Sequence, residues 1–357
     1  MKIRHSIFVL SLFAVLTFMS CQKKAGSEDY KPPTIGKSSE LSIVISDAYW
    51  EDSLGQVLRK IFKQPVPYLP QDEPMFDVSQ FPPAIFKDAF LKTRNVLVVQ
   101  IDPKYADPSI DVLVVPIDQD STGPSIATAN DVYARPQSIA YLRADSPTAA
   151  ASYISKAENV VLRYFLERNR NAQILTNKNF KDLKLQNVVS EKFDVNIILT
   201  PGYREAVLPE GDDDFMWLDF NGSIARMGIL IYTNPYLDQE MFSKEAIIER
   251  RNEMLKKYVQ GDKDSSYMTT EIELLPSVKS INFRGSYAVE MRGLWKMQND
   301  FLGGPFISLT VLDEKNNRLV TVEGFVSAQA TEKRDYMRQV EAIVYSLSFI
   351  EDAAIEQ

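Results

Sequence analysis

The sequence predicts an α+β protein made of two α/β-layered domains, the second an antiparallel sheet flanked by helices. A chain of 357 residues is longer than a single hydrophobic core normally supports, which predicts two domains. In the first half, apolar strand-like runs alternate with helical patterns, whereas the second half is dominated by successive strands. We therefore expect an N-terminal α/β domain at residues 40–172 and a C-terminal α+β domain at residues 173–350.

The first 20 residues have the layout of a lipoprotein signal peptide. Lys2 and Arg4 form a basic end, residues 7–18 are almost entirely apolar, and the small residue Ser20 precedes Cys21, the only cysteine. This apolar run is shorter than the ~20 residues that a membrane-spanning helix needs, which favours a cleaved export segment. We expect lipid attachment at Cys21, although Phe18 stands where this signal usually has leucine.

Residues 21–39 are polar, charged and proline-ended, which predicts a flexible tether. Acyl chains contribute ~0.8 kcal/mol for each buried methylene, so the anchored protein is expected to stay on its membrane. Because no aspartate follows Cys21, we expect an outer-membrane lipid anchor. The acidic pair Glu28-Asp29 lies too far from Cys21 for a surface-export tag, so the periplasmic face is favoured over the cell surface.

The mature chain lacks several catalytic side chains. Its single histidine, His5, lies in the signal peptide, and its one thiol is used by the lipid. Ser-His-Asp and Cys-His catalysis, the usual zinc sites and thiol redox chemistry are thereby excluded. No phosphate-binding glycine pattern, Gly-x-Ser-x-Gly elbow or Ser-x-x-Lys dyad occurs in the mature chain that begins at Cys21. This leaves carboxylate pairs, lysine, tyrosine, hydroxyls activated by lysine, or calcium or magnesium held by oxygen ligands for any catalysis. Among these we expect no cofactor and no metal site.

The charge balance argues against nucleic-acid binding. The chain has 40 basic and 48 acidic residues, and loss of Lys2 and Arg4 leaves 38 basic residues and a formal net charge of −10. An acidic surface repels phosphate backbones, so no nucleic-acid partner is expected.

The N-terminal domain is predicted to alternate strands and helices. Leu54, Leu58 and Ile61 share one helical face, and the strand at 94–101 shows little alternation, which indicates burial on both faces. Ser146 is a predicted helix N-cap. The expected elements are strands at 41–45, 94–101, 112–115 and 137–142, helices at 51–62, 83–91 and 147–168, and a proline-rich loop at 65–74.

The C-terminal domain is predicted to be an antiparallel sheet. Ser243 caps an amphipathic helix that ends at Gly261, and the polar turn 314–317 joins two strands as a hairpin. The expected elements are strands at 195–199, 215–220, 225–232, 267–274, 280–291, 305–312 and 318–326, and a final helix at 331–347. The boundary between the domains is expected between Asn169 and Phe193.

Six segments spread over nearly the whole mature chain carry a resemblance. They are Trp50-Glu51, Leu69-Pro70-Gln71-Asp72-Glu73-Pro74, Arg94-Asn95-Val96, Arg292-Gly293-Leu294-Trp295, Gly303-Gly304-Pro305-Phe306 and Lys333-Arg334-Asp335-Tyr336-Met337-Arg338-Gln339. This set resembles a lipoprotein family of Bacteroidetes-type bacteria that is known only as a domain of unknown function. The resemblance implies an envelope lipoprotein and carries no catalytic residue. More loosely, the element order of the second half is similar to the fold shared by photosystem oxygen-evolving accessory proteins and a nuclear-transport factor, an analogy of topology alone.

The candidate sites each have a structural alternative. Trp50 and Trp295 beside Glu51 and Arg292 would stack on a sugar or peptide, or would serve only as core or rim packing. The acidic run 210–214 would hold calcium, or would be a solvated loop. Gly303-Gly304-Pro305 is expected to be a turn that permits close backbone approach, with a ligand loop as the alternative. The candidate binding surface comprises Trp50, Glu51, Gln71, Glu73, Arg292 and Trp295.

Two hypotheses of function follow. The favoured one is a noncatalytic lipoprotein, held to the membrane by its lipidated N-terminus, that binds an envelope protein or glycan or assists assembly at the outer membrane. The alternative is a hydrolase of envelope glycan or peptide that uses paired carboxylates, with Glu51 and Glu73 as candidates; carriage of a small ligand is a further possibility.

Overall fold

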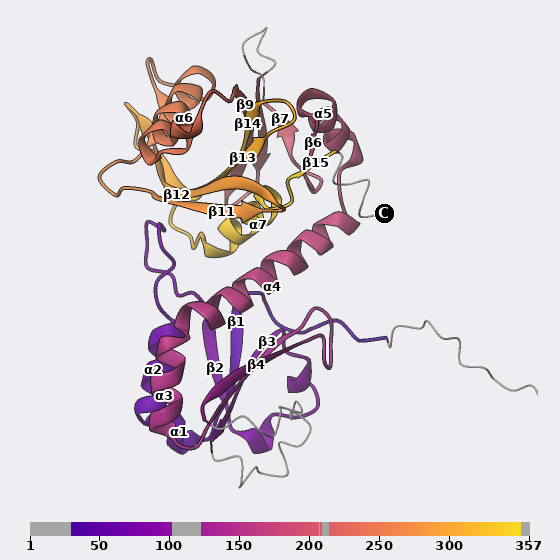
Figure 1. Ribbon diagram of the computed structural model, residues 1–357, viewed down its shortest axis with the longest axis vertical. Coiled ribbons are helices and arrows are strands. Elements are labelled where there is room, and N and C mark those ends of the chain that lie inside the picture. Colours follow the sequence, from indigo (N-terminus) through magenta and orange to yellow (C-terminus); the bar gives the residue numbers. More distant parts are fainter. Residues whose placement is uncertain (1–29, 102–122, 207, 209–213, 351–357) are drawn as a thin grey trace, which may run out of the picture.

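The computed structural model describes residues 30–101, 123–206, 208 and 214–350. These residues form two bodies, each built on its own sheet, and the long helix α4 (Glu158–Asn179) runs between them (Figure 1). The predicted α+β class and the two-domain architecture are confirmed. No helix in the described part of the chain has the length and apolarity required to cross a membrane.

The N-terminal sheet has five strands in the order β2-β1-β3-β5-β4, all parallel except β4. Its strands are β1 (Glu40–Val44), β2 (Asp77–Phe81), β3 (Asn95–Ile101), β4 (Ser125–Asn130) and β5 (Ser138–Ala144). β3 lies in the middle, and Val96 to Val99 are buried, which confirms the expectation of a strand covered on both faces. The predicted strand at 112–115 lies outside the described residues.

Helices cover one face of this sheet. α2 (Ser53–Phe62) and α3 (Pro147–Lys156) pack there, and the hydroxyl of Ser146 accepts a hydrogen bond from the backbone N–H of Ala149, which confirms the predicted cap. A short helix α1 (Asp47–Glu51) precedes α2. A Cβ on Gly55 would overlap the carbonyl of Trp50, so the junction between α1 and α2 requires glycine.

Two helix predictions in this domain are wrong in detail. Residues 83–92 form two 3₁₀ turns, Pro83–Ile85 and Phe90–Lys92, and Asp88 between them has a positive φ of 54°, which the interior of a regular helix does not accommodate. The helix predicted at 147–168 is divided at Ala157 into α3 and α4. α4 continues to Asn179 and thus crosses the predicted division between residues 172 and 173.

The predicted tether is too long at its C-terminal end. Ile35 donates from its backbone N–H to the carbonyl of Lys92 and accepts from the N–H of Arg94, and Pro33 forms a bridge with Arg135. Ser39 is fully buried. Residues 33–39 therefore belong to the folded N-terminal body, and Cys21 and its surroundings lie outside the described residues.

The C-terminal sheet is antiparallel and has eight strands in the order β10-β12-β13-β14-β9-β8-β7, with β11 also paired to β12. Its strands are β7 (Arg204–Glu205), β8 (Phe215–Asn221), β9 (Arg226–Pro235), β10 (Tyr267–Thr270), β11 (Ser277–Phe283), β12 (Ser286–Gln298), β13 (Gly303–Asp313) and β14 (Arg318–Ser327). The hairpin at 314–317 joins β13 to β14, as predicted.

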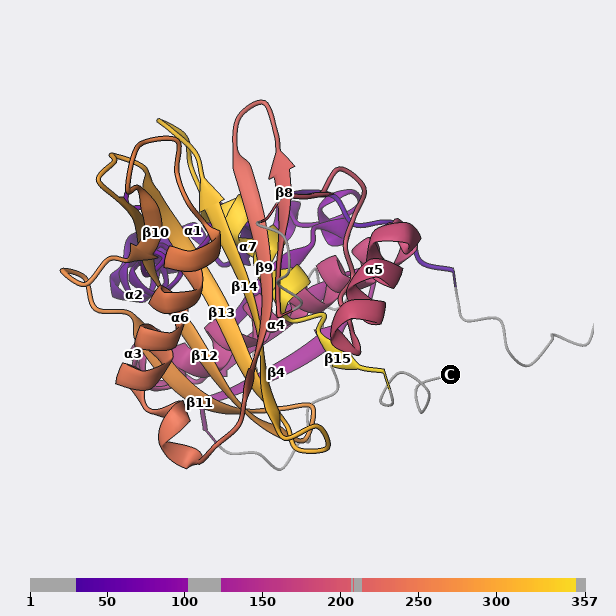
Figure 2. The same cartoon turned by 90° about the horizontal axis from the view of Figure 1, so that it is seen from above.

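Helices lie on both faces of this sheet. α6 (Lys244–Tyr258), capped by Ser243 as predicted, packs on one face, and α7 (Arg334–Val344) packs on the other (Figure 2). α5 (Leu183–Phe193) and the small ladder of β6 (Val195–Asn196) with β15 (Ser348–Phe349) extend the α7 side. Alternating residues of β13 and β14 fill the two cores, which explains the apolar alternation in the sequence.

Three predictions in this domain need correction. The strand expected at 280–291 is the β11–β12 hairpin, turned at Arg284-Gly285, where both residues have positive φ. α5 was not predicted at all. Gly303 and Gly304 lie in β13 and not in a turn, but the predicted close approach is real, because a Cβ on Gly304 would overlap the carbonyl of Val326.

Candidate functional site

The tryptophan-glutamate pair of the predicted surface lies at the first helix of the N-terminal domain. Trp50 is half-buried; the guanidinium of Arg59 lies 4.5 Å from its ring centroid and donates to its carbonyl at 2.9 Å. Glu51 is exposed at the end of α1. α1 lies at the far end of the N-terminal domain from the junction between the domains (Figure 1).

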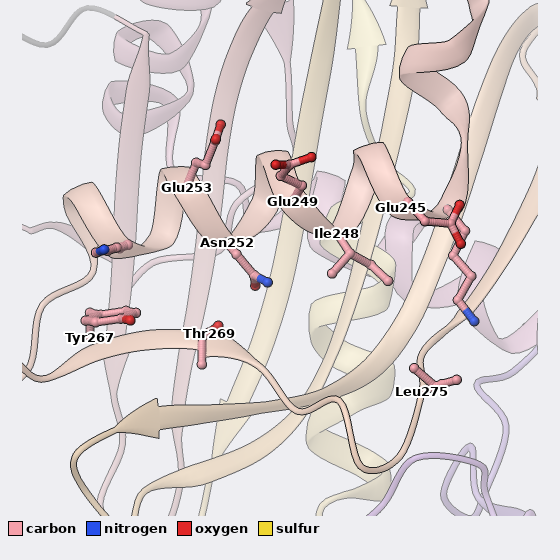
Figure 3. Close-up of a pocket in the computed structure, with 10 residues that line it drawn as sticks. Glu245, Ile248, Glu249, Asn252, Glu253, Tyr267, Thr269 and Leu275 are labelled. Carbon is pink, nitrogen blue, oxygen red and sulfur yellow. The ribbon is translucent and has the colours of Figure 1, made fainter.

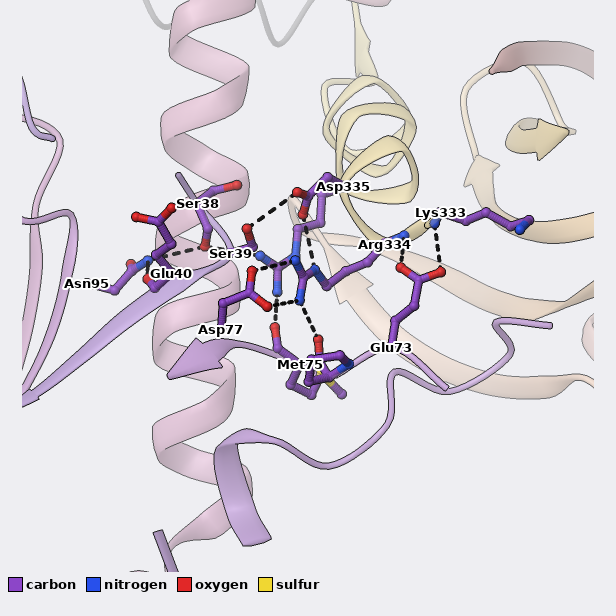
Figure 4. A network of polar contacts seen from close by, with 12 residues as sticks. Ser38, Ser39, Glu40, Glu73, Met75, Asp77, Asn95, Lys333, Arg334 and Asp335 are labelled. Atoms are coloured by element: carbon purple, nitrogen blue, oxygen red, sulfur yellow. Dashed lines mark hydrogen bonds and ion pairs between the residues drawn. The ribbon is translucent and has the colours of Figure 1, made fainter. Parts of the chain in front are cut away.

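Glu73 has a structural role between the domains. It is 3% exposed, and its two carboxylate oxygens accept hydrogen bonds from the backbone N–H groups of Lys333 and Arg334, each at 2.7 Å (Figure 4). Glu73 thus caps the start of α7 from the other domain. Gln71 is exposed and accepts a weak hydrogen bond from Lys333 Nζ at 3.4 Å.

Trp295 belongs to the C-terminal core. It is 3% exposed, its indole N–H donates to the carbonyl of Val326 at 3.2 Å, and its ring packs edge-on against Phe325. Arg292 is the only one of the six predicted residues among those lining the cleft between the domains. The six predicted residues therefore do not lie on one common surface. Their positions near the ends of predicted strands did not indicate which face of the sheet each side chain would occupy.

The first turns of α7 hold the N-terminal domain through arginines. Arg334 forms a two-point ion pair with Asp77, at 2.7 and 3.1 Å, and donates to the carbonyl of Pro74. Burial acts to raise the pKa of Asp77, but the hydrogen bond and charge of Arg334 lower it. Arg338 donates to the carbonyls of Ser38 and Met75, at 3.0 and 2.6 Å. These contacts fix α7 against the N-terminal body.

Beside this interface is a cleft of about 750 Å³ between the two domains. The proline-rich loop forms one wall with Val66, Tyr68 and Leu69, and α4 and α7 form others. Five of the six segments that carry the family resemblance contribute residues to its lining, namely residues 69–74, 94–96, 292–295, 303–306 and 333–339. The cleft is of the size that binds small ligands or short segments.

The floor of the cleft carries a cluster of paired charges. Arg292 binds Glu290 at 2.8 Å and Glu341 at 3.0 Å, and Arg170 binds Glu341 at 2.9 Å. The hydroxyl of Tyr345 donates to Glu290, and the guanidinium of Arg170 lies over the Tyr345 ring.

The carboxylates of this cluster are held in the ionised form. Burial acts to raise the pKa of Glu341, but the charges and hydrogen bonds of Arg292 and Arg170 outweigh it and lower the pKa to about 2. The pKa of Glu290 is lowered in the same way, because the effects of Arg292 and Tyr345 exceed that of burial. A general acid needs a raised pKa, so neither carboxyl group is suited to donate a proton at neutral pH.

Five further cations of the cleft have no ion pair to a carboxylate among the described residues. Arg94 donates from Nε to the side-chain carbonyl of Asn169 at 2.9 Å and has no carboxylate within ion-pair distance in the described residues. Burial lowers the pKa of Arg94, and burial likewise lowers the pKa of Arg338 to about 10. The exposed cations that line the same cleft are Lys37, Arg163 and Lys279.

Apart from Arg292, the sequence analysis did not name the cations of the cleft as site residues. Arg94 and Arg338 lie within segments that carry the family resemblance, so the sequence did mark their positions as candidates. Arg163 and Lys279 carried none, because nothing in the sequence shows that the faces of α4 and β11 meet.

A second hollow of about 670 Å³ runs along α6 and β10 (Figure 3). Glu245, Glu249 and Glu253 follow one another at helical spacing along its rim, and Asn252 is tied to Thr270 by hydrogen bonds at 2.7 and 2.9 Å. Of the acidic run 210–214, only Asp214 is described, and it accepts a hydrogen bond from Thr233 at 3.3 Å. The described residues contain no cluster of His, Cys, Asp and Glu side chains that could hold a metal ion.

Comparison with known families matches both halves of the chain. Residues 34–178 match one domain of unknown function (DUF8532), and residues 182–346 match another (DUF4837). Two domains of unknown function are therefore present in this chain. No curated protein matches it.

Solved structures give weak similarities. The Ran-binding protein Mog1p of Saccharomyces cerevisiae is 9% identical, covers 45% of this chain and 92% of its own, and has a TM-score of 0.29. A single-residue mutant of Mog1 is 10% identical, with coverage of 45% and 93% and a TM-score of 0.28. The lipid transfer and protein localization domain of human StarD13 (DLC2) is 11% identical, with coverage of 46% and 93% and a TM-score of 0.21.

Proposed function

We propose that this protein is a lipid-anchored component of the cell envelope that binds a partner without catalysis, or assists assembly, at the outer membrane. The signal-peptide layout that ends at Cys21 supports the anchor. The absence of aspartate after Cys21 supports an outer-membrane position, and the distance of the acidic pair Glu28-Asp29 from Cys21 supports the periplasmic face over the cell surface. In this proposal the folded body works as an adaptor beside the membrane.

The observation that carries the binding role is the cleft between the domains. It is formed by both domains, it is large enough for a ligand, and its partly buried carboxylates Glu290 and Glu341 are paired with arginines. Such a site offers fixed charges and apolar walls for recognition. The pKa values of Glu290 and Glu341 are lowered, which does not suit these two carboxyl groups to donate a proton at neutral pH.

The alternative, a carboxylate-dependent hydrolase of envelope glycan or peptide, has weaker support. Its proposed pair does not assemble: Glu51 is exposed on α1, whereas both oxygens of Glu73 bind the start of α7. Acid-base hydrolysis needs two carboxyl groups on either side of one bond. No observation of the described residues supplies such a pair.

The anchor is tested by mass and location. The native protein is expected to have lost its first 20 residues, to carry acyl groups on Cys21, and to sediment with the outer membrane. A Cys21→Ala variant is expected to appear in the soluble fraction. An intact start methionine with an unmodified sulfhydryl would overturn the anchor.

The binding role is tested by affinity capture from detergent-solubilised envelope with the folded body, residues 30–350, as bait. We expect a reproducible protein or glycan partner whose capture falls when the cleft is altered. Capture of nothing reproducible, or product release from cell-wall substrates that Glu51→Gln abolishes, would contradict the role.

A further inference from the structure

We propose that the cleft between the domains binds an acidic, aliphatic peptide segment of a partner protein. This inference rests on the binding function proposed above and names the chemistry of the ligand. Three properties of the cleft support it: its charge, the fixed position of its cations, and the nature of its apolar walls.

The charge of the cleft is opposite to that of the protein. The chain is acidic overall, yet five cations line this cleft without an ion pair to any described carboxylate, and only one acid of the lining, Glu167, is similarly free. These cations are Lys37, Arg94, Arg163, Lys279 and Arg338. A cleft lined by one sign of charge concentrates ligands of the other sign. The local excess of positive charge therefore selects an anionic ligand.

Two of these cations are already positioned. Arg338 is held by two backbone carbonyls and lies over the ring of Phe76 at 5.0 Å, and the Nε of Arg94 is fixed by Asn169. The terminal nitrogens of Arg94 have no hydrogen bond to any described residue. The two terminal nitrogens of such a guanidinium can donate together to one carboxylate. Because Nε is already held, little side-chain entropy is lost when a ligand binds.

The apolar walls favour a peptide over a glycan. Most of the apolar lining is aliphatic or thioether, including Val66, Leu69, Leu162, Leu166 and Met337; its aromatic residues are Tyr68, which is half-buried, and Phe306, which is 1% exposed. Sugar rings bind best on open aromatic faces, whereas methionine and leucine adapt to aliphatic side chains. A peptide segment with both acidic and aliphatic residues is complementary to the cations of the cleft and to its apolar lining.

Tyr68 marks the loop that would close over this segment. It lines the cleft in the left-handed region, with φ of 62°, between prolines that stiffen the loop. A non-glycine residue in this region stores strain that the surrounding structure must hold, and such strain gathers at ligand sites. The loop that forms this wall of the cleft therefore has a restricted backbone conformation.

The test is fluorescence anisotropy with the folded body, residues 30–350, and a labelled synthetic peptide of alternating glutamate and leucine. Competitors are the same peptide with lysine for glutamate, polygalacturonate, and inorganic phosphate. The cleft variant is Arg163→Glu with Lys279→Glu, two exposed positions. The matched control is Lys60→Glu with Lys184→Glu, which changes the same charge on exposed surfaces outside the cleft.

We expect the acidic peptide to bind, the lysine peptide and phosphate to fail as competitors, and the cleft variant to weaken binding by about tenfold or more while the control leaves it unchanged. Binding that the two variants weaken equally would overturn the inference, because it would reflect net charge alone. If polygalacturonate binds in the cleft and the peptide does not, the peptide class is wrong while a binding function stands. If no probe binds and affinity capture also returns no partner, both proposals fail.

Discussion

The carboxylate of Glu73 accepts a hydrogen bond from the backbone N–H of Arg334 at 2.7 Å, so a residue of the N-terminal domain caps a helix of the C-terminal domain. The side chain of Arg334 in turn forms an ion pair with Asp77 of the N-terminal domain. The two domains therefore stabilise each other at the first turn of α7, next to the cleft (Figure 4).

Replacement of Glu73 tests this relationship. Glu73→Ala leaves two buried N–H groups at the helix start without an acceptor, and we expect a loss of about 1–2 kcal/mol in the free energy of unfolding. The measurement is urea unfolding. The control, Glu51→Ala, removes an exposed carboxylate and is expected to change the free energy by less than about 0.5 kcal/mol. Equal effects of the two changes would contradict the capping role.

A second prediction concerns the ion pair of Arg251 and Glu323, whose side chains are both 0% exposed. The guanidinium of Arg251 donates two hydrogen bonds, each of 2.7 Å, to the two carboxylate oxygens of Glu323. Removal of one partner leaves a buried charge uncompensated, so Arg251→Met alone is expected to cost about 3–5 kcal/mol. The double variant with Glu323→Leu is expected to cost much less than the sum of the single changes. Additive costs in urea unfolding would contradict this coupling.

A third prediction concerns the stability at acid pH. The folded-state pKa of Glu341, about 2, lies below its ordinary value of 4.5, so its ionised form stabilises the fold at neutral pH. This contribution is lost as pH falls from about 5 toward 2. Glu341→Gln is expected to be less stable at neutral pH and to show a flatter dependence on pH over this range. If the free energy of unfolding of Glu341→Gln depended on pH as steeply as that of the unmodified protein, Glu341 would not be the source of this pH dependence.

Gly304 gives a fourth prediction. Because a Cβ at this position would overlap the carbonyl of Val326, which also accepts from Trp295, Gly304→Ala is expected to separate β13 from β14 locally and to lower the unfolding temperature. Gly285→Ala removes the positive-φ freedom of a turn but meets no atom there. A smaller loss for Gly304→Ala than for Gly285→Ala in thermal unfolding would contradict the overlap.

The regular parts of the fold could be predicted from local pattern. Ser146 and Ser243 cap their helices as expected, and the hairpin at 314–317 joins two alternating strands. These features depend on neighbours along the chain, so the sequence contains them. β2 and β4 could not be found, because both are edge strands with polar, weakly patterned residues.

The candidate site could be predicted only in part, because it depends on tertiary contacts. Glu73 and Arg334 are 261 residues apart, and no spacing rule connects them. Arg292 lines the cleft, whereas Trp295, three residues further along β12, is buried in the core. Which face of a long strand meets another domain is decided by packing that a single sequence does not display.

Amide hydrogen exchange of the folded body, with and without the glutamate-leucine peptide, tests the central claim most directly. The account predicts slower exchange in the proline-rich loop at 66–69, in α4 and in the first turns of α7, where the peptide would lie between the domains. Slower exchange confined to α6 and β10, or no change anywhere at saturating peptide, would contradict it.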